Sequence, residues 1–194
     1  MWHETLSDPR LYALLARFDA EVAEELRQTG CPACGGRLHR ADSPRKPRGG
    51  PADLGREYEV RASFCCADRR CRRRKTPESL RFLGRRVFLG VVVLLGSALA
   101  QGLTPRRVAE LRARLGVDRR TLCRWRVWWT ETFVATGFWA RTRGTFLPSV
   151  ASAELPGALL ERFTHPEPHL RVLQIAVFLA PLSVDGAGSP SGGG

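Results

Sequence analysis

The chain has 194 residues and a formal net charge of +12, from 31 basic and 19 acidic side chains. Hydrophobic residues make up 43% of the sequence, which excludes a wholly disordered chain, and the length allows one domain or two small modules. Nearly all of the positive charge is arginine, whose guanidinium group pairs with phosphate and guanine, so the composition favours a polyanion such as nucleic acid. A GC-rich coding genome would produce the same arginine excess without any function.

The first predicted element is a helix within residues 1–30. The sequence Ser7-Asp8-Pro9 is typical of a helix start, apolar residues then recur at steps of three and four, and Thr29-Gly30 ends the pattern. Its predicted polar side is acidic and carries Asp19, Glu21, Glu24 and Glu25. We interpret it as a packing helix, with a partner-binding helix as the alternative. Because no signal segment is visible, we expect a cytoplasmic chain with reduced cysteines, which favours metal ligands over disulfides.

Residues 31–79 are predicted to form a small zinc-ribbon-like β module. Cys31 and Cys34 are three residues apart, and Gly35 permits the backbone curl that lets two thiolates hold one ion. The segment Arg56–Cys66 alternates like a strand, with Tyr58, Val60, Ala62 and Phe64 on one face. Cys66 shares the face of Phe64, whereas Cys65 points to the opposite side.

These spacings predict a structural zinc ion bound by Cys31, Cys34, Cys66 and Cys71. The choice of Cys66 over Cys65 is close, and the gap between Cys66 and Cys71 is wider than the usual two residues. A redox pair at Cys31 and Cys34, or reduced thiols in a small core, are the alternatives. Residues 41–55 read as a loop. The zinc ion would hold in place a basic run of Arg69, Arg70, Arg72, Arg73, Arg74 and Lys75.

Residues 80–143 are predicted to form a helical domain. The stretch Val87–Pro105 carries no charge, but glycines and polar residues interrupt it, so a buried helix is favoured over a membrane span. A second helix starts at Thr104-Pro105 and ends at Leu115. Gly116 supplies a left-handed turn, Val117 enters the core and Asp118 caps a third helix that continues to Phe133.

This pair of helices is typical of a helix-turn-helix, with an ordinary helical hairpin as the alternative. Leu122, Trp125 and Trp129 face inward in the third helix, although Trp128 is a candidate for exposure. The residues predicted to contact base edges are Arg119, Arg120, Thr121 and Arg124. The residues predicted to contact phosphates are Arg106, Arg107 and Arg126, together with the basic run. Cys123 would lie at the boundary with DNA.

The C-terminal part is predicted to hold a helical segment over 144–183 and a disordered tail over 184–194. A short helix is expected around Leu159–Phe163, followed by an apolar segment over Leu170–Leu182. The tail is mostly glycine and serine, a composition that cannot bury a core.

The order of these features resembles the zinc-ribbon and helix-turn-helix head of bacterial insertion-sequence transposases. The likeness covers about Cys31 to Trp129. It implies a mainly α, α+β fold in which the β module precedes a homeodomain-like helical domain that binds element ends. In such transposases a ribonuclease-H-like domain follows, with three carboxylates and magnesium, but the third of the chain left after Trp129 is too short for it. We therefore expect a non-catalytic, nucleoid-associated protein that binds double-stranded DNA.

Three other functions are kept as alternatives. The first is an RNA-binding or ribosome-associated zinc-ribbon protein. The second is an assembly partner of a catalytic transposase, which would use the acidic first helix and the apolar C-terminal segment. The third is a membrane-anchored regulator. The sequence leaves the DNA target and the oligomeric state open.

Overall fold

The structure is a computed structural model that describes residues 2–51, 53–84, 88–100 and 104–184. It is mixed α+β and mainly helical, which confirms the predicted fold class at this level. Residues 185–194 of the predicted tail lie outside the described residues.

The N-terminal part is helical, as predicted. The short helix α1 (Trp2–Thr5) precedes the long helix α2 (Pro9–Thr29). Asp8 caps α2, because its Oδ1 accepts the backbone N–H of Arg10 at 3.0 Å, and Gly30 ends it with a φ of +84°. With 21 residues, α2 is about 32 Å long.

Two small antiparallel sheets lie along α2. The strands β1 (Leu38–Arg40), β4 (Phe64–Cys66) and β5 (Arg74–Lys75) form one sheet in the order β1-β4-β5, and β2 (Ser43–Pro44) pairs with β3 (Val60–Arg61) in the other. Leu38, Phe64 and Cys66 pack with Ala23 of α2 in a small separate core. The sheet β1-β4-β5 therefore lies against the C-terminal half of α2.

The predicted strand over Arg56–Cys66 is confirmed at β3 and β4 but is wrong over residues 56–59. Residues Arg56–Glu59 form a 3-10 turn, η1, and the strand that follows is interrupted between β3 and β4. Val60 is 39% exposed, whereas the side chain of Arg61 is buried. Arg61 turns inward because its guanidinium donates to the carbonyl of Pro77 and lies near Asp19, partners that alternation within the strand cannot show.

The remaining chain forms a helical part. Its helices are α3 (Gly90–Leu99), α4 (Pro105–Leu115), α5 (Arg119–Val127), α6 (Gly137–Thr142), α7 (Gly157–Leu160) and α8 (Pro168–Leu179). Single turns extend or link them at η2 (Trp128–Phe133), η3 (Arg143–Thr145), η4 (Ser152–Glu154) and η5 (Ala180–Ser183). Residues 91–97 of α3 are buried, so the uncharged stretch contains a core helix as predicted. Among the described residues, no helix is long and apolar enough to cross a membrane.

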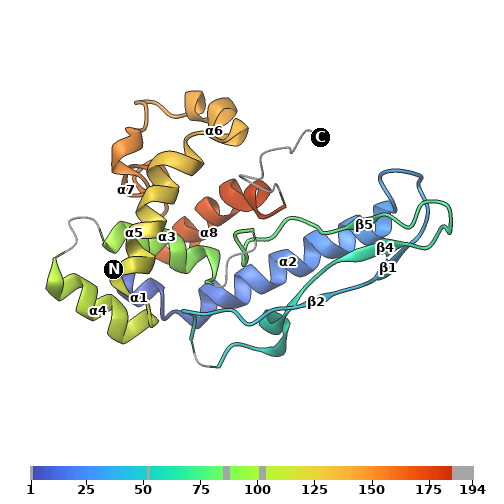
Figure 1. The fold of residues 1–194 in the computed structure, drawn as a ribbon, viewed down its shortest axis with the longest axis horizontal. Helices are drawn as coiled ribbons and strands as arrows, with labels where there is room; N and C mark the ends of the chain where they lie inside the picture. The colour runs from blue at the N-terminus through green and yellow to red at the C-terminus, as the bar shows by residue number, and fades with distance from the viewer. Residues whose placement is uncertain (1, 52, 85–87, 101–103, 185–194) are drawn as a thin grey trace.

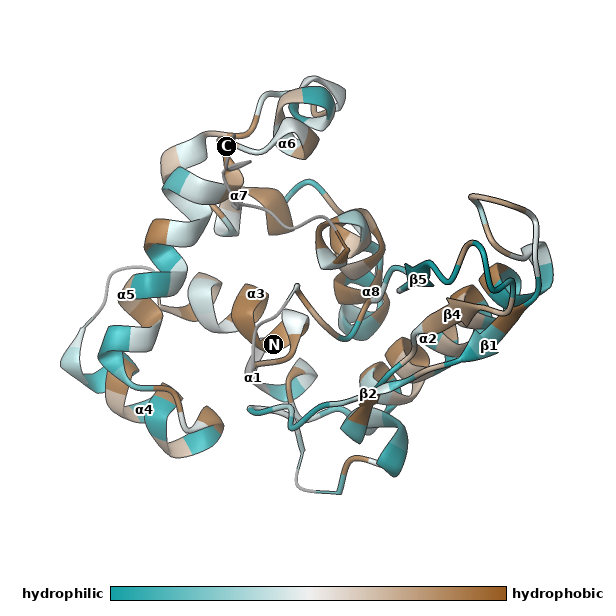
Figure 2. Cartoon of the chain, turned by 45° about the vertical axis from the view of Figure 1, so that its right-hand side comes forward, coloured by the Kyte–Doolittle hydropathy of each residue, from teal (hydrophilic) through white to brown (hydrophobic). Residues whose placement is uncertain are grey.

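One large core joins the N-terminal and C-terminal helices. It contains Leu15 from α2, Leu94 from α3, Trp129 from η2 and Ile175 from α8, all buried. Figure 2 shows hydrophobic residues concentrated on α3 and α8, with hydrophilic residues along α4. The acidic first helix and the apolar C-terminal segment thus pack against each other through α2 and α8.

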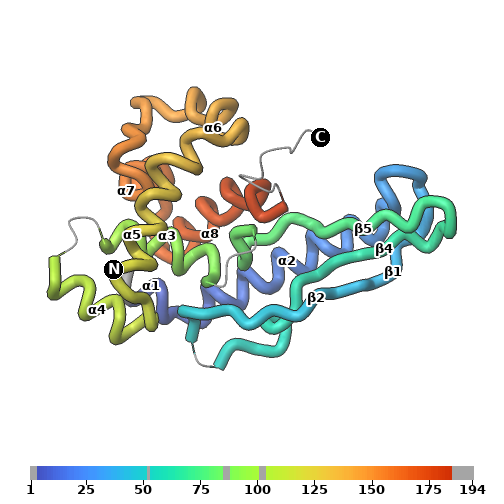
Figure 3. Tube along the Cα trace, in the orientation of Figure 1, coloured from blue at the N-terminus to red at the C-terminus, as the bar shows by residue number. Residues whose placement is uncertain are grey.

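The molecule is elongated, as Figure 1 and the tube in Figure 3 show. The helical part lies at one end and the sheet β1-β4-β5 at the other, and α2 runs between them.

Candidate metal centre and basic surfaces

Four cysteines meet at the end of the molecule where α2 stops. The sulfur atoms of Cys31, Cys34, Cys66 and Cys71 all lie within 4.8 Å of one another. Cys31 Sγ is 3.7 Å from Cys71 Sγ, and Cys34 Sγ is 3.5 Å from Cys66 Sγ. These are the four predicted ligands, and this group can hold a metal ion.

The spacing of the sulfurs fits a tetrahedral ion. Four thiolates at about 2.3 Å from one ion stand about 3.8 Å apart along the edges of the tetrahedron. The two measured pairs are close to this value and far longer than the S–S bond of about 2.05 Å in a disulfide. Four protein ligands would fill a tetrahedral site, which is the arrangement of structural rather than catalytic metal centres.

The first pair of cysteines lies on a tight backbone turn. The N–H groups of Cys34 and Gly35 donate to the carbonyl of Cys31 at 3.2 and 2.7 Å, and Gly35 has a φ of +71°. Gly36 gives the sulfurs room, since a Cβ there would lie 3.2 Å from Cys66 Sγ and 3.3 Å from Cys34 Sγ. Gly35 therefore permits the predicted backbone curl, and Gly36 leaves space for the sulfur atoms of Cys34 and Cys66.

The second pair of cysteines, Cys66 and Cys71, lies on a turn with the same backbone hydrogen bonds, but the first sulfur comes from outside the turn. Arg72, which follows Cys71, has a φ of +45°, and its N–H donates to the carbonyl of Asp68 at 2.9 Å. Asp68 thus occupies the place that Cys31 has in the first turn, and its Oδ1 accepts the N–H of Arg70 at 2.7 Å. The sulfur comes instead from Cys66 at the end of β4, two residues earlier. This explains why the gap between Cys66 and Cys71 is wide.

Cys65 is not part of the group. Its thiol is directed at the carbonyl oxygens of Cys66 and Arg72, at 3.7 and 3.6 Å. The strand alternation that distinguished it from Cys66 therefore held at this position. Cys66, by contrast, is completely buried beside Phe64.

The thiols of Cys31 and Cys66 differ in acidity. A hydrogen bond from the backbone N–H of Ala33 is the main cause that lowers the pKa of Cys31 to about 7, whereas burial raises the pKa of Cys66 to about 12. A bound cation removes this difference, because a thiol that coordinates a metal is deprotonated.

The metal centre carries the first basic surface. Arg69, Arg70, Arg72 and Arg73 are exposed around the turn between β4 and β5, and no ion pair neutralises them among the described residues. Arg74 lies across the sheet, where its Nε donates to Ser63 Oγ at 2.9 Å and its Nη2 donates to the carbonyl of Ala41. We name the residues Arg69–Lys75 the hairpin surface.

The corner between α4 and α5 has the predicted turn chemistry. Thr104 caps α4 by accepting the N–H of Arg107 at 3.3 Å, and Gly116 ends it with φ +64° and ψ +23°. Val117 is fully buried. Asp118 caps α5, because its Oδ1 accepts the N–H of Thr121 at 2.6 Å, and this bond holds the pKa of Asp118 below its usual value.

The exposed side of α5 carries the second basic surface. Arg119, Arg120, Arg124 and Arg126 are exposed, as are Arg106 and Arg107 at the start of α4. Arg106 donates to Glu110 at 3.1 Å along the helix. We name the exposed arginines of α4 and α5 the helical surface. Cys123 is exposed within it.

Thr121, which was predicted to contact base edges, lies on the buried side of α5. Thr121 is 7% exposed, and its Oγ1 accepts a hydrogen bond from Arg124 Nη2 at 3.0 Å. Residues four apart share a helix face, so Thr121 lies on the face of the buried Trp125. Trp128 is buried too, at 8% exposure, because its ring packs against Trp129 with centroids 4.7 Å apart.

The acidic side predicted for the first helix also needs correction. Asp19 is buried, at 3% exposure, and its Oδ2 accepts the Nε–H of Arg81 at 2.8 Å. Its Oδ1 accepts the N–H of Leu80 at 2.6 Å. No periodicity within α2 could reveal these partners, which lie some 60 residues along the chain.

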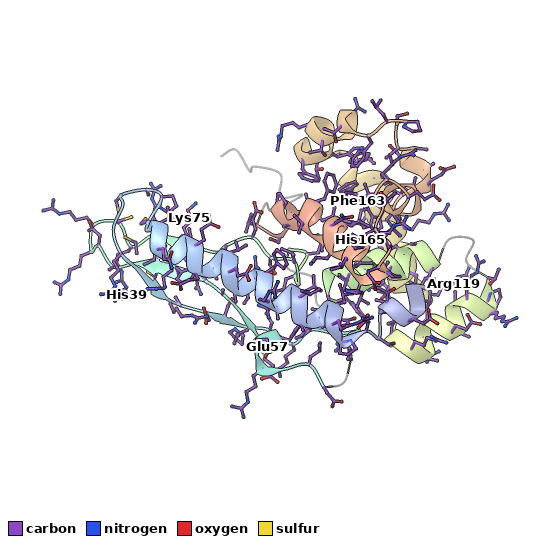
Figure 4. All side chains as sticks on the ribbon, turned by 180° about the vertical axis from the view of Figure 1, so that it is seen from behind. His39, Glu57, Lys75, Arg119, Phe163 and His165 are labelled. Atoms are coloured by element: carbon purple, nitrogen blue, oxygen red, sulfur yellow. The ribbon has the colours of Figure 1, made fainter. Side chains whose placement is uncertain are left out.

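The two basic surfaces lie at opposite ends of the molecule. Figure 4 shows Arg119 at one end of the molecule and His39 and Lys75 at the other. The length of α2 separates the two ends (Figure 1). A single ligand that touches both surfaces must therefore extend along the molecule.

Comparison of the chain with protein-family models, with curated proteins and with solved structures finds no match.

Proposed function

We propose that this chain is a zinc-stabilised protein that binds duplex DNA through α5 and carries out no chemical step. The observation that carries the proposal is the Asp118-capped start of α5. Arg119 and Arg120 are exposed there without an ion pair among the described residues, while Leu122 and Trp125 hold the opposite side in the core. A helix so anchored can present its first turns to a major groove.

The packing of α5 supports this role, since base recognition needs a rigid helix. The ring of Trp125 meets Phe88 edge-on at 5.1 Å, and Trp129 meets Phe133 at 5.0 Å. Gly96 of α3 lets the Trp125 ring approach, because a Cβ there would lie 2.9 Å from it. The anchoring side of α5 is thus formed by aromatic rings, and the arginine side faces solvent.

The ion proposed for the metal centre is zinc. Four cysteine thiolates are a typical ligand set for structural zinc, and the sulfur spacing agrees with the length of the zinc–sulfur bond. The core beside the four cysteines is small, so the ion would supply stability that burial cannot provide. Its role is to hold the hairpin surface in one conformation.

The arginines then divide into two groups. Arg119, Arg120 and Arg124 are proposed to reach base edges, and Arg106, Arg107, Arg126 and the hairpin surface to contact phosphates. A transposase-associated, nucleoid-located role belongs to the same proposal. It is supported by the order of a four-cysteine module before a capped helix pair.

The test compares Arg120→Ala with Arg72→Ala in a gel-shift series over duplexes of different sequence. Arg120→Ala should reduce discrimination between duplexes by about 1–3 kcal/mol, since a bidentate arginine contact to guanine is worth that much. Arg72→Ala should weaken binding to all duplexes equally. If the two variants change sequence discrimination equally, the proposed division into base-contacting and phosphate-contacting arginines is wrong.

A structured RNA of equal length is the necessary competitor in this series. Tighter binding to the RNA than to any duplex DNA would support the alternative of an RNA-binding zinc-ribbon protein instead.

A further inference from the structure

Positive charge also lies on the surface that connects the two ends of the molecule. Residues 37–48 leave the metal centre, form β1 and β2, and run beside α2 to the helical part (Figures 1 and 3). Arg37, Lys46 and Arg48 are exposed along this segment. We name these three residues the basic track.

The side chains of the track are available to a ligand. Exposure alternates from Pro44 to Arg48, with Arg45 partly buried and Lys46 exposed, so Lys46 and Arg48 project to the same side. Arg45 instead lies over the ring of Phe82 at 5.6 Å. Among the described residues, no carboxylate pairs with Arg37, Lys46 or Arg48, whereas Arg40 pairs with Asp42 at 3.4 Å.

The track ends against the elements that hold α5. The N–H of Leu89 donates to the carbonyl of Arg48 at 3.3 Å, and Arg48 forms a bridge with Phe88. The ring of Phe88 in turn packs against Trp125 of α5. The other end of the track, at Arg37, is three residues from Cys34. The track therefore runs from the cysteine cluster beside the hairpin surface to the segment that packs against the buried side of α5.

The opposite side of α2 has the other charge. Because successive helical residues are 100° apart, Glu21 and Glu25 point away from Ala23 and Leu26, which contact the sheet. Glu21 pairs with Arg17 at 3.3 Å, whereas no ion pair is formed by Glu25 among the described residues. The sheet side carries carboxylates as well, because Glu57 and Glu59 are exposed on the segment next to β2.

We infer that the basic track is a third phosphate-binding element, and that one DNA duplex lies along it from the helical surface to the hairpin surface. The inference rests on the proposed function. The helix α2, which runs between the two ends of the molecule, is about 32 Å long, and this corresponds to about one turn of B-DNA. Each track residue near a phosphate would release condensed counterions, as the end surfaces do.

The experiment measures binding of the full, zinc-loaded chain to a 30-base-pair duplex of random sequence, by fluorescence anisotropy at several salt concentrations. The test variant is Lys46→Ala with Arg48→Ala. The matched control is Arg141→Ala with Arg143→Ala, two exposed arginines on α6 and η3. The melting temperature of every variant is measured first, and the charge reversal Lys46→Glu with Arg48→Glu is made as well.

The expected result is that the track variant binds on the order of tenfold more weakly and that its slope of log K against log salt falls by about two. The charge reversal should have a larger effect, and the control should bind as the unmodified chain does. Hydroxyl-radical footprinting of the unmodified chain should show protection over more than one helical turn.

Unchanged binding by both track variants, while Arg119→Ala with Arg120→Ala weakens binding, would overturn this inference and leave the proposed function standing. If Arg119→Ala with Arg120→Ala also leaves DNA binding unchanged, both this inference and the proposed function are wrong. A track variant that loses affinity for duplex RNA but not for DNA would show that the track serves another partner and would overturn the inference too.

Discussion

Asp19 of α2 and Arg81 form a buried ion pair, with Oδ2 and Nε 2.8 Å apart and both side chains at most 6% exposed. Asp19 also accepts the N–H of Leu80 and the hydroxyl of Ser79. The guanidinium of Arg81 lies 5.1 Å from the centre of the Tyr58 ring. One carboxylate thus connects α2 to the segment that precedes α3.

The first prediction concerns this ion pair. Asp19→Asn keeps the shape of the side chain but leaves the charge of Arg81 buried without compensation, so it should lower the free energy of unfolding by about 3–5 kcal/mol. Urea unfolding measures this change. Glu25→Gln, an exposed carboxylate on the same helix, should change stability by less than about 0.5 kcal/mol. If both variants change the free energy of unfolding by the same amount, the ion pair between Asp19 and Arg81 does not stabilise the fold.

The second prediction concerns metal content. Cys34→Ser removes one of the four clustered sulfurs, so the purified protein should lose its stoichiometric zinc and melt at a lower temperature. Cys65→Ser alters the adjacent thiol that lies outside the group, and it should retain the metal. Metal analysis by atomic emission after dialysis distinguishes these outcomes. Unmodified protein without zinc would rule out the proposed ion.

The third prediction concerns the left-handed residues of the two cysteine turns. Gly35 and Arg72 both have positive φ, and a Cβ at Gly35 would meet no atom within 4 Å. Gly35→Ala should therefore cost about 1–2 kcal/mol from backbone strain alone, and Arg72→Gly should relieve that strain. Chemical denaturation of the zinc-loaded chain measures both. Stabilisation by Gly35→Ala would contradict the described turn.

The fourth prediction concerns the contact between α3 and α5. Gly96→Ala places a methyl group 2.9 Å from the Trp125 ring, so it should destabilise the protein by about 1–3 kcal/mol and weaken DNA binding by displacing α5. Gly144→Ala is the control, since a Cβ there meets nothing within 4 Å. Thermal unfolding and anisotropy on the same duplex measure the two effects. A neutral Gly96→Ala would mean that α5 is loosely held.

The fifth prediction concerns pH and the cap of α5. The pKa of Asp118 is lowered by the hydrogen bond from the Thr121 N–H, so the ionised cap stabilises the fold above the ordinary pKa of about 3.8. This contribution is lost as the pH falls through the lower, folded pKa. Asp118→Ala should therefore melt below the unmodified protein at pH 7.

The difference in melting temperature between the two proteins should shrink as the pH falls below 3.8. Asp118→Asn keeps an oxygen acceptor, so it should recover stability at pH 7 without this pH dependence. A difference that stays constant with pH would show that the charge of Asp118 contributes nothing.

The sequence by itself determined the features whose partners lie within a few residues. The helix starts at Ser7-Asp8-Pro9 and Thr104-Pro105, the cap at Asp118, the left-handed Gly116 and the turn at Cys31–Gly35 were all predicted correctly. Strand alternation also distinguished Cys66 from Cys65. Each of these depends on local hydrogen bonds or on the two-residue period of a strand, and both are visible in a short stretch of chain.

The tertiary structure decided what depends on distant partners. Asp19 was assigned to the polar side of the first helix, but it is buried, as is Arg61, because both meet charges and carbonyls from other segments. The separation of the two basic surfaces depends on how α2 packs between the sheet and α8. The periodicity of a short segment cannot show that a charged residue is buried, because the free energy of burying a charge depends on the groups that the fold places around it. It also cannot show how far apart two surfaces lie.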